Sequence, residues 1–154
     1  MANFVANLVK GKVRFYTELP AANDGLVLVL GKFTGMETDA TLKDYDTLAA
    51  VFAAANDEAD FTGYARKAVV PSAATIDDAN DRVDVDAADV SAYTNTGGAS
   101  QRTGKAIIAY DPDTTAGTDA DLIPLLWYDC DITFDIGVAT TLPFNAAGFA
   151  RFQD

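Results

Sequence analysis

The chain has 154 residues, 49% of them apolar, which predicts one domain, residues 1–154, with a sizeable buried core. Lys and Arg number 11 against 23 Asp and Glu, and the formal charge of −12 argues against nucleic acid and anionic membranes as partners, because both are bound through clusters of Lys and Arg. The lack of His and the single Cys exclude His-dependent catalytic triads, His-ligated metal sites and an intramolecular disulfide.

The N-terminal segment is apolar and basic, and its cations all precede the first acid. We interpret residues 1–12 as a basic arm and residues 12–16, where apolar and basic residues alternate, as a first strand. A positive end on an acidic molecule favours docking, while a terminal strand with a solvated face explains the same pattern. The contact candidates in this segment are Phe4, Leu8, Lys10, Lys12 and Arg14.

The start of the chain lacks the continuous apolar core and the small-residue cleavage site of a secretory signal. No run of the sequence approaches the roughly 18 apolar residues of a membrane span. We therefore expect the protein to be made in a cytoplasm and to fold there first.

Two runs that are apolar on both faces predict inner strands, at residues 26–30 (LVLVL) and 105–110 (KAIIAY). Between them, apolar residues at spacings of three and four predict an amphipathic helix over about residues 40–56. Thr41 is its expected N-cap and Asn56 its expected C-terminal stop.

Further strands are predicted at residues 61–70, 82–87, 122–137 and 144–152, and polar loops at residues 91–104 and 111–121. Several short strands with one helix predict a mainly β fold. The expected architecture is an antiparallel β-sandwich or barrel with the helix packed on one side.

The strand around Cys130 separates an apolar face from an acidic one. Counting by twos puts the thiol on the apolar face, which favours core packing over a nucleophile. Asp129, Asp131 and Asp135 share the other face, where a solvated surface is favoured over a metal site or a glycosidase pair. Alternate residues of one strand stand about 6.5 to 7 Å apart, so one strand alone does not aim two carboxylates at one cation.

The stretch RVDVDAADVSAY, residues 82–93, follows an acidic run that invites comparison with a calcium loop. The template laid on from Asp78 fails, because Arg82 occupies its fifth position and Val83 replaces the glycine of its sharp turn. A looser structural Ca²⁺ site formed by Asp77, Asp78 and Asp81 stays open, and no other cofactor is expected.

Several blocks together resemble a family of small virion structural proteins of tailed bacteriophages, of the capsid decoration (cement) or minor capsid type. The blocks cover most of the chain, and they are NLVKGKVRFY with DGLVLVL, DATLKDYDTLAAVFAAANDEADFTGYARK, DDANDRVDVDAADVSAYT, and AYDPDTTAGTDADLIPLLWYD with FNAAGFARF. The two middle blocks are the most specific. Many relatives have Trp where this chain has Tyr93, which is a mild departure.

The resemblance implies a mainly β, non-enzymatic protein that binds the outside of the capsid and stabilises the shell, after synthesis in the cytoplasm of a bacterial host. It implies the major capsid protein and other copies of the chain as partners, with a homotrimer as the expected oligomer. The basic arm is the first choice for the contact, and the loop from Thr94 to Arg102 is the second. The alternative is a head-fibre or tail component that binds host-surface glycan, and an acidic-site hydrolase ranks third.

Overall fold

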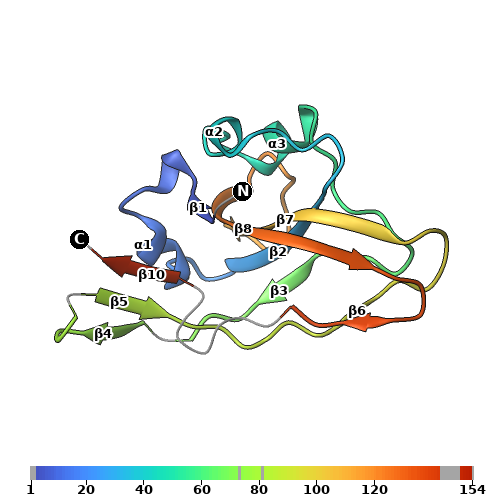
Figure 1. Ribbon diagram of the computed structural model, residues 1–154. Coiled ribbons are helices and arrows are strands. Elements are labelled where there is room, and N and C mark those ends of the chain that lie inside the picture. The colour runs from blue at the N-terminus through green and yellow to red at the C-terminus, as the bar shows by residue number, and fades with distance from the viewer. Residues whose placement is uncertain (1–2, 73, 81, 143–149, 154) are drawn as a thin grey trace.

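The computed structural model describes residues 3–72, 74–80, 82–142 and 150–153, and the fold is mainly β, as predicted (Figure 1). Its middle layer is a five-stranded antiparallel sheet with the strand order β1-β8-β7-β2-β3. These strands are β1 (Phe4–Val5), β2 (Gly25–Lys32), β3 (Lys67–Val69), β7 (Gln101–Asp111) and β8 (Ile123–Phe134). Every pairing within this sheet is antiparallel.

Two smaller sheets cover one face of the five-stranded sheet, and two short helices cover the other (Figure 1). The three-stranded sheet has the order β10-β5-β4 and consists of β4 (Thr75–Asp77), β5 (Arg82–Val85) and β10 (Ala150–Gln153). The two-stranded sheet pairs β6 (Tyr93–Thr94) with β9 (Ala139–Thr140), and the helices are α2 (Asp39–Leu42) and α3 (Leu48–Ala53). The arrangement is therefore a sandwich of sheets with a helical layer outside it.

The five-stranded sheet is buried on both faces, and alternate residues of its inner strands enter different apolar clusters. On β2, Leu28 and Leu30 belong to the larger cluster, which also contains Val85 of β5, while Val29 belongs to the smaller cluster under the helices. On β7, Ile108 and Ile107 divide between the two clusters in the same way. The prediction of two inner strands is confirmed, because β2 and β7 lie inside the sheet order.

The helix predicted over about residues 40–56 is two short helices with a turn between them. The second helix begins at Thr47, whose hydroxyl accepts from the Ala50 amide at 3.1 Å. The Leu48 and Ala49 amides donate to the carbonyls of residues 122 and 119 in a distant loop, at 3.0 and 2.9 Å. They therefore do not donate to carbonyls four residues earlier, as they would in one continuous helix. Thr41, the expected N-cap, lies inside α2 instead, and α3 ends before Asn56.

The N-terminal segment is packed against the body of the protein and is mostly helical. It consists of the 3-10 helix η1 (Asn7–Val9) and the helix α1 (Val13–Thr17), so residues 12–16 are not a strand. Ala6, Val9 and Val13 are buried, and the Ala6 amide donates to the Leu125 carbonyl at 3.1 Å. The run had been too short to separate a period of two from a period of 3.6, since Val13 and Thr17 also share a helical face.

Strand boundaries differ from the predictions at several places. Only Lys67–Val69 of the predicted strand at residues 61–70 is extended, and β8 is one strand across most of residues 122–137. The last predicted strand, residues 144–152, lies mostly outside the described residues, and Ala150–Gln153 forms β10.

Candidate functional site

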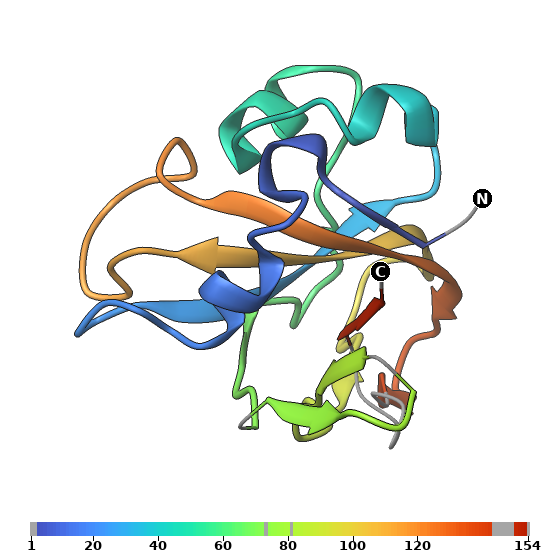
Figure 2. The same cartoon turned by 90° about the vertical axis from the view of Figure 1, so that its left-hand side faces the viewer.

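The η1–α1 segment presents apolar and basic side chains together, and Figure 2 shows it lying across the face turned to the viewer. Leu8 and Phe15 are 49% and 55% exposed, although both are large apolar residues. The cations between them are exposed as well. We call this the N-terminal surface, and its members are Leu8, Lys10, Lys12, Arg14 and Phe15. Sequence reasoning missed Phe15, because a strand would have turned its ring toward the core with Val13.

Bonds on the inner side hold the N-terminal surface in place. The Asn7 backbone amide donates to the Lys43 carbonyl at 2.7 Å, and the Asn7 side-chain amide donates to the Asp44 carboxylate. Arg14 pairs with Glu18 one turn along α1, at 2.8 Å. The exposed side chains therefore stand on a fixed backbone, which lowers the ordering cost of docking.

Phe4 contributes to internal packing beside this surface. Its ring stacks on Trp127 with a centroid distance of 5.6 Å and lies 4.9 Å from the Lys105 ammonium. Lys105 is fully buried, and its ammonium forms ion pairs with Asp129 at 2.7 Å and Asp39 at 3.0 Å. A buried ammonium is tolerated here because carboxylates on two sides and a ring face neutralise it. These residues tie β1, α2, β7 and β8 together.

A hollow of about 460 Å³ lies between the end of α1 and the connection from β3 to β4. Its walls include Arg14, Thr17, Glu18, Leu19, Pro71 and Ala74. Leu19 has a φ of 52°, a left-handed conformation that favours glycine. The hollow thus has a mixed lining of three apolar side chains, the hydroxyls of Thr17 and Ser72, one cation and one acid, next to a strained backbone.

The second predicted contact segment, from Thr94 to Arg102, is largely satisfied within the protein. Thr94 is half-buried in β6. The Arg102 guanidinium donates to both oxygens of Asp131, at 2.6 and 2.7 Å, and lies 3.5 Å over the Phe33 ring. This guanidinium holds the pKa of the Asp131 carboxyl below its usual value. Arg102 is therefore less suited to an intermolecular contact than the cations of the N-terminal surface.

Asn95, wholly buried, fixes the turn that joins β8 to β9. Its side-chain amide donates to the carbonyls of Ala99 and Phe134 at 2.9 and 3.1 Å, and its own carbonyl accepts from Gly137 at 2.8 Å. The turn closes with a bond of 3.2 Å from the Val138 amide to the Asp135 carbonyl. Gly137 takes a φ of 77° there, which glycine adopts without strain.

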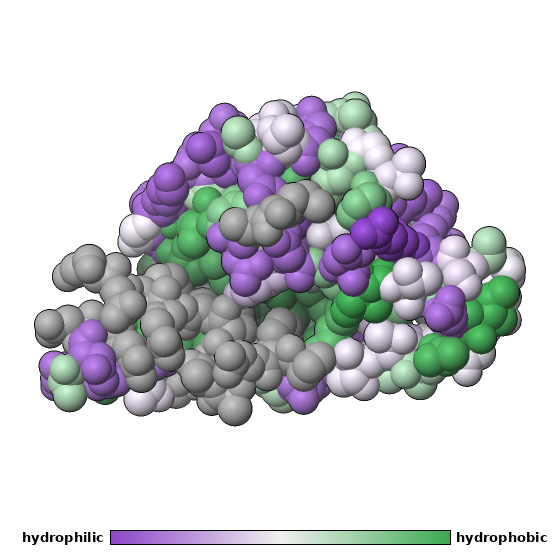
Figure 3. All heavy atoms as spheres, viewed as in Figure 1, coloured by the Kyte–Doolittle hydropathy of each residue, from purple (hydrophilic) through white to green (hydrophobic). Residues whose placement is uncertain are grey.

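This turn, residues 135–138, is called the far turn here, and it exposes Ile136 and Val138 by 51% and 52%. In Figure 1 it lies at the right-hand end, away from η1 and α1 on the left. Figure 3 shows hydrophobic atoms gathered at that right-hand end. The molecule therefore exposes large apolar side chains at two opposite ends.

The calcium candidates fall on the hairpin between β4 and β5. Asn80 donates to Asp77 from both its backbone and its side chain, to the carbonyl at 3.2 Å and to the carboxylate at 2.8 Å. Asp78 is exposed, and Asp81 lies outside the described residues. Within the described part of the chain, no group of three or more His, Cys, Asp or Glu side chains could hold a metal ion. The Asp77 carboxylate closes this hairpin.

Cys130 packs in the larger apolar cluster, as predicted, with 5% of its surface exposed. Burial raises the pKa of its thiol, which disfavours the reactive thiolate. On the opposite face, Asp129 and Asp131 meet Lys105 and Arg102 of β7. The acidic face of β8 is therefore matched by cations across the strand pair and is only partly a solvated surface.

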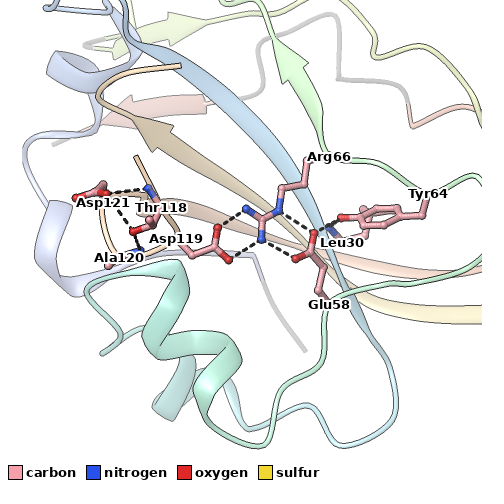
Figure 4. A network of polar contacts seen from close by, with 8 residues as sticks. All are labelled: Leu30, Glu58, Tyr64, Arg66, Thr118, Asp119, Ala120 and Asp121. Carbon is pink, nitrogen blue, oxygen red and sulfur yellow. Dashed lines mark hydrogen bonds and ion pairs between the residues drawn. The ribbon is translucent and has the colours of Figure 1, made fainter. Parts of the chain in front are cut away.

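A network around Arg66 joins β3 to two loops (Figure 4). The guanidinium donates to Glu58 at 2.6 and 2.8 Å and also to both oxygens of Asp119. Tyr64 donates to Glu58 at 2.9 Å and accepts from the Leu30 amide at 3.1 Å. Arg66 lowers the pKa of the Asp119 carboxyl. Each charge has a partner of opposite sign, so the network stabilises the fold. No spacing in the sequence predicted it, because Arg66 and Asp119 lie far apart along the chain.

Comparison of the chain with protein-family models, with curated proteins and with solved structures finds no match. Among the described residues, no helix has the length and apolar character needed to cross a membrane. The exposed side chains at the two ends of the molecule are therefore the features that bear on its function.

Proposed function

We propose that the protein is a non-enzymatic virion subunit of a tailed bacteriophage that binds the outside of the capsid as a decoration subunit and stabilises the shell. It is made in the cytoplasm of the bacterial host, and its partners are the major capsid protein and further copies of itself. The observation that carries the proposal is the N-terminal surface, a fixed basic and apolar patch on a molecule with a charge of −12. The family resemblance of the sequence blocks supports the same role.

The capsid contact is assigned to the η1 corner, where Leu8, Lys10 and Lys12 project. An exposed apolar anchor surrounded by cations is typical of a protein contact, because burial of the anchor supplies affinity and the charges orient the partner. Val9 and Val13 hold the corner from inside. The partner surface is expected to be acidic or rich in carbonyl groups, as suits lysine donors.

Co-sedimentation with undecorated capsids tests the function. The purified wild-type chain is expected to bind in a saturable amount. Lys10→Glu with Lys12→Glu is expected to weaken binding about tenfold, since both charges would then oppose the partner. Leu8→Ser is expected to weaken it to a similar extent through the lost anchor.

Two matched controls accompany these variants. Lys10→Arg with Lys12→Arg keeps both charges, and Ile76→Ser removes an even more exposed apolar side chain from β4. Both variants are expected to bind as the wild type does. A wild-type chain that fails to bind capsids but binds host-surface glycan would overturn the proposal in favour of a head-fibre or tail component.

A further inference from the structure

We propose that the far turn of one copy inserts into the hollow of a second copy, so that subunits associate head to tail. The inference rests on the self-association included in the proposed function, and it names the two surfaces that meet. The occupant of the hollow is thus a second copy of this chain.

The far turn has the form of a rigid projection. The bond from Val138 to Asp135 closes it, and Asn95 anchors it from behind through the Gly137 amide. Ile136 occupies its first corner and pairs as an isolated bridge with Asn95. Half of the Ile136 side-chain surface therefore remains exposed without freedom of the backbone. Such a preorganised apolar group loses little entropy on docking.

The hollow offers the matching surface. Leu19, Pro71 and Ala74 supply apolar walls, and about 460 Å³ is enough for one or two aliphatic side chains. The Pro71 wall is itself fixed, because Pro71 bridges to Ala87 and the Ser72 amide donates to the Asp86 carbonyl at 2.7 Å. Both partners of the contact are therefore preformed.

Charge sets the direction of the contact. Asp135, at the start of the far turn, is exposed, and Arg14 stands at the rim of the hollow. The side chain of Arg14 is 48% exposed and pairs only with Glu18 of its own helix turn, so a second carboxylate can approach it. Pairing of Asp135 with Arg14 places Ile136 toward the apolar walls.

The contact is heterologous, because it joins two different surfaces: the far turn lies at one end of the molecule, and α1, whose last turn lines the hollow, lies at the other (Figure 1). A heterologous contact closes into a ring only when the rotation between neighbours permits it, and otherwise it builds an open chain of subunits. The η1 corner, with Leu8, Lys10 and Lys12, stays outside this contact and remains available for the capsid.

Sedimentation velocity of the full chain, at concentrations up to about 1 mM, tests the proposal without any capsid. The wild type is expected to form a concentration-dependent oligomer. Ile136→Ser with Val138→Ser is expected to weaken association tenfold or more through the lost apolar burial. Arg14→Glu and Asp135→Lys are each expected to weaken it, and their combination is expected to restore it, since the two charges are then exchanged.

Leu8→Ser is the matched control, because it removes another half-exposed apolar side chain and is expected to leave self-association unchanged. A wild type that sediments as a monomer throughout, or a charge exchange that restores nothing, would overturn the proposal. Loss of capsid binding by the Leu8 variant with its oligomer intact would support the separation of the two surfaces. A wild-type oligomer that ignores capsids would contradict only the proposed function.

Discussion

Leu19 carries a backbone strain that its position after α1 explains. It is the only non-glycine residue in the described part of the chain with a left-handed φ, at 52°. Its amide still donates to the Tyr16 carbonyl at 3.3 Å, as the residue after a helix does, and its side chain packs on the larger apolar cluster. The conformation costs about 1–2 kcal/mol in a residue with a Cβ atom.

At this position a glycine variant should therefore be more stable than an alanine variant, which is the reverse of their usual order. Leu19→Ala loses packing and keeps the strain, whereas Leu19→Gly loses packing and relieves it. We expect the glycine variant to be more stable by about 0.5–1 kcal/mol, measured by urea unfolding. Ala68→Gly, on exposed β3, should instead lose stability. An alanine variant as stable as the glycine variant would refute the strain argument.

At the scale of single residues, the sequence predicted the face of the sheet on which a side chain lies where the period-two pattern of a strand was clear. Cys130 was predicted on the apolar face and is buried there. The strand predicted at residues 12–16 would put Phe15 on the same face as Val13, but Phe15 is exposed because the segment is helical. The pairing of Arg66 with Asp119 joins residues far apart in sequence, so no local pattern encodes it.

At the scale of elements, the break between α2 and α3 makes Thr47 a helix cap. Its hydroxyl accepts from the Ala50 amide at 3.1 Å, whereas Thr41 lies inside α2 and its hydroxyl bonds to the Thr38 hydroxyl at 3.2 Å. We expect Thr47→Ala to lower the free energy of unfolding by about 1 kcal/mol and Thr41→Ala to change it little. Thermal unfolding of both variants checks this. An equal loss of stability in the two variants would instead support Thr41 as the helix cap, as predicted from the sequence.

The inner strands could be predicted because a strand that is buried on both faces needs a continuous run of apolar residues, and this pattern is easily seen in the sequence. The helical face was also foreseen, since Leu42 and Leu48 are both buried under it. The break between α2 and α3 was not foreseen, because the partners of the Leu48 and Ala49 amides are carbonyls of the distant residues 122 and 119. A tertiary contact thus decided where the helix stops, and local propensity could not register it.

At the scale of the whole molecule, paired carboxyls set the acid limit of stability. The pKa values of Asp60, Asp119 and Asp131 are lowered, mainly by hydrogen bonds with Lys32, Arg66 and Arg102 respectively. The folded state therefore holds these protons less tightly than the unfolded state. Their stabilisation is complete above about pH 4 and is lost as the pH falls through the lowered values.

We accordingly expect the melting temperature to fall between about pH 4 and pH 2, and Asp119→Asn to flatten that fall. Calorimetry in moderate salt is the suitable measurement, because salt screens the general repulsion among excess acids more than the half-buried Arg66 pair. An unchanged slope in the variant would exclude the Arg66 network as a source of the acid sensitivity.

The positions of the exposed ends are also a property of the whole molecule. The basic residues near Lys10 are visible in the sequence, whereas Ile136 lies two residues after Phe134 and so continues the period-two apolar pattern of its strand there. It is exposed because β8 ends at Phe134 and the chain turns. Where a strand leaves the core depends on its neighbours, which a single sequence does not display.

Lys105 of β7 and Asp129 of β8 lie opposite each other, and their ion pair also disfavours misaligned strands during folding. A slip of two residues keeps every side chain on its face, so burial alone does not oppose it. In one direction the slip sets Asp129 opposite Ile107, within the apolar layer under the helices. In the other direction it sets Lys105 opposite Trp127, which separates it from Asp129 and leaves it with Asp39 of α2. Each slip breaks the ion pair of the buried Lys105 with Asp129, so this pair favours the native alignment of the two longest strands.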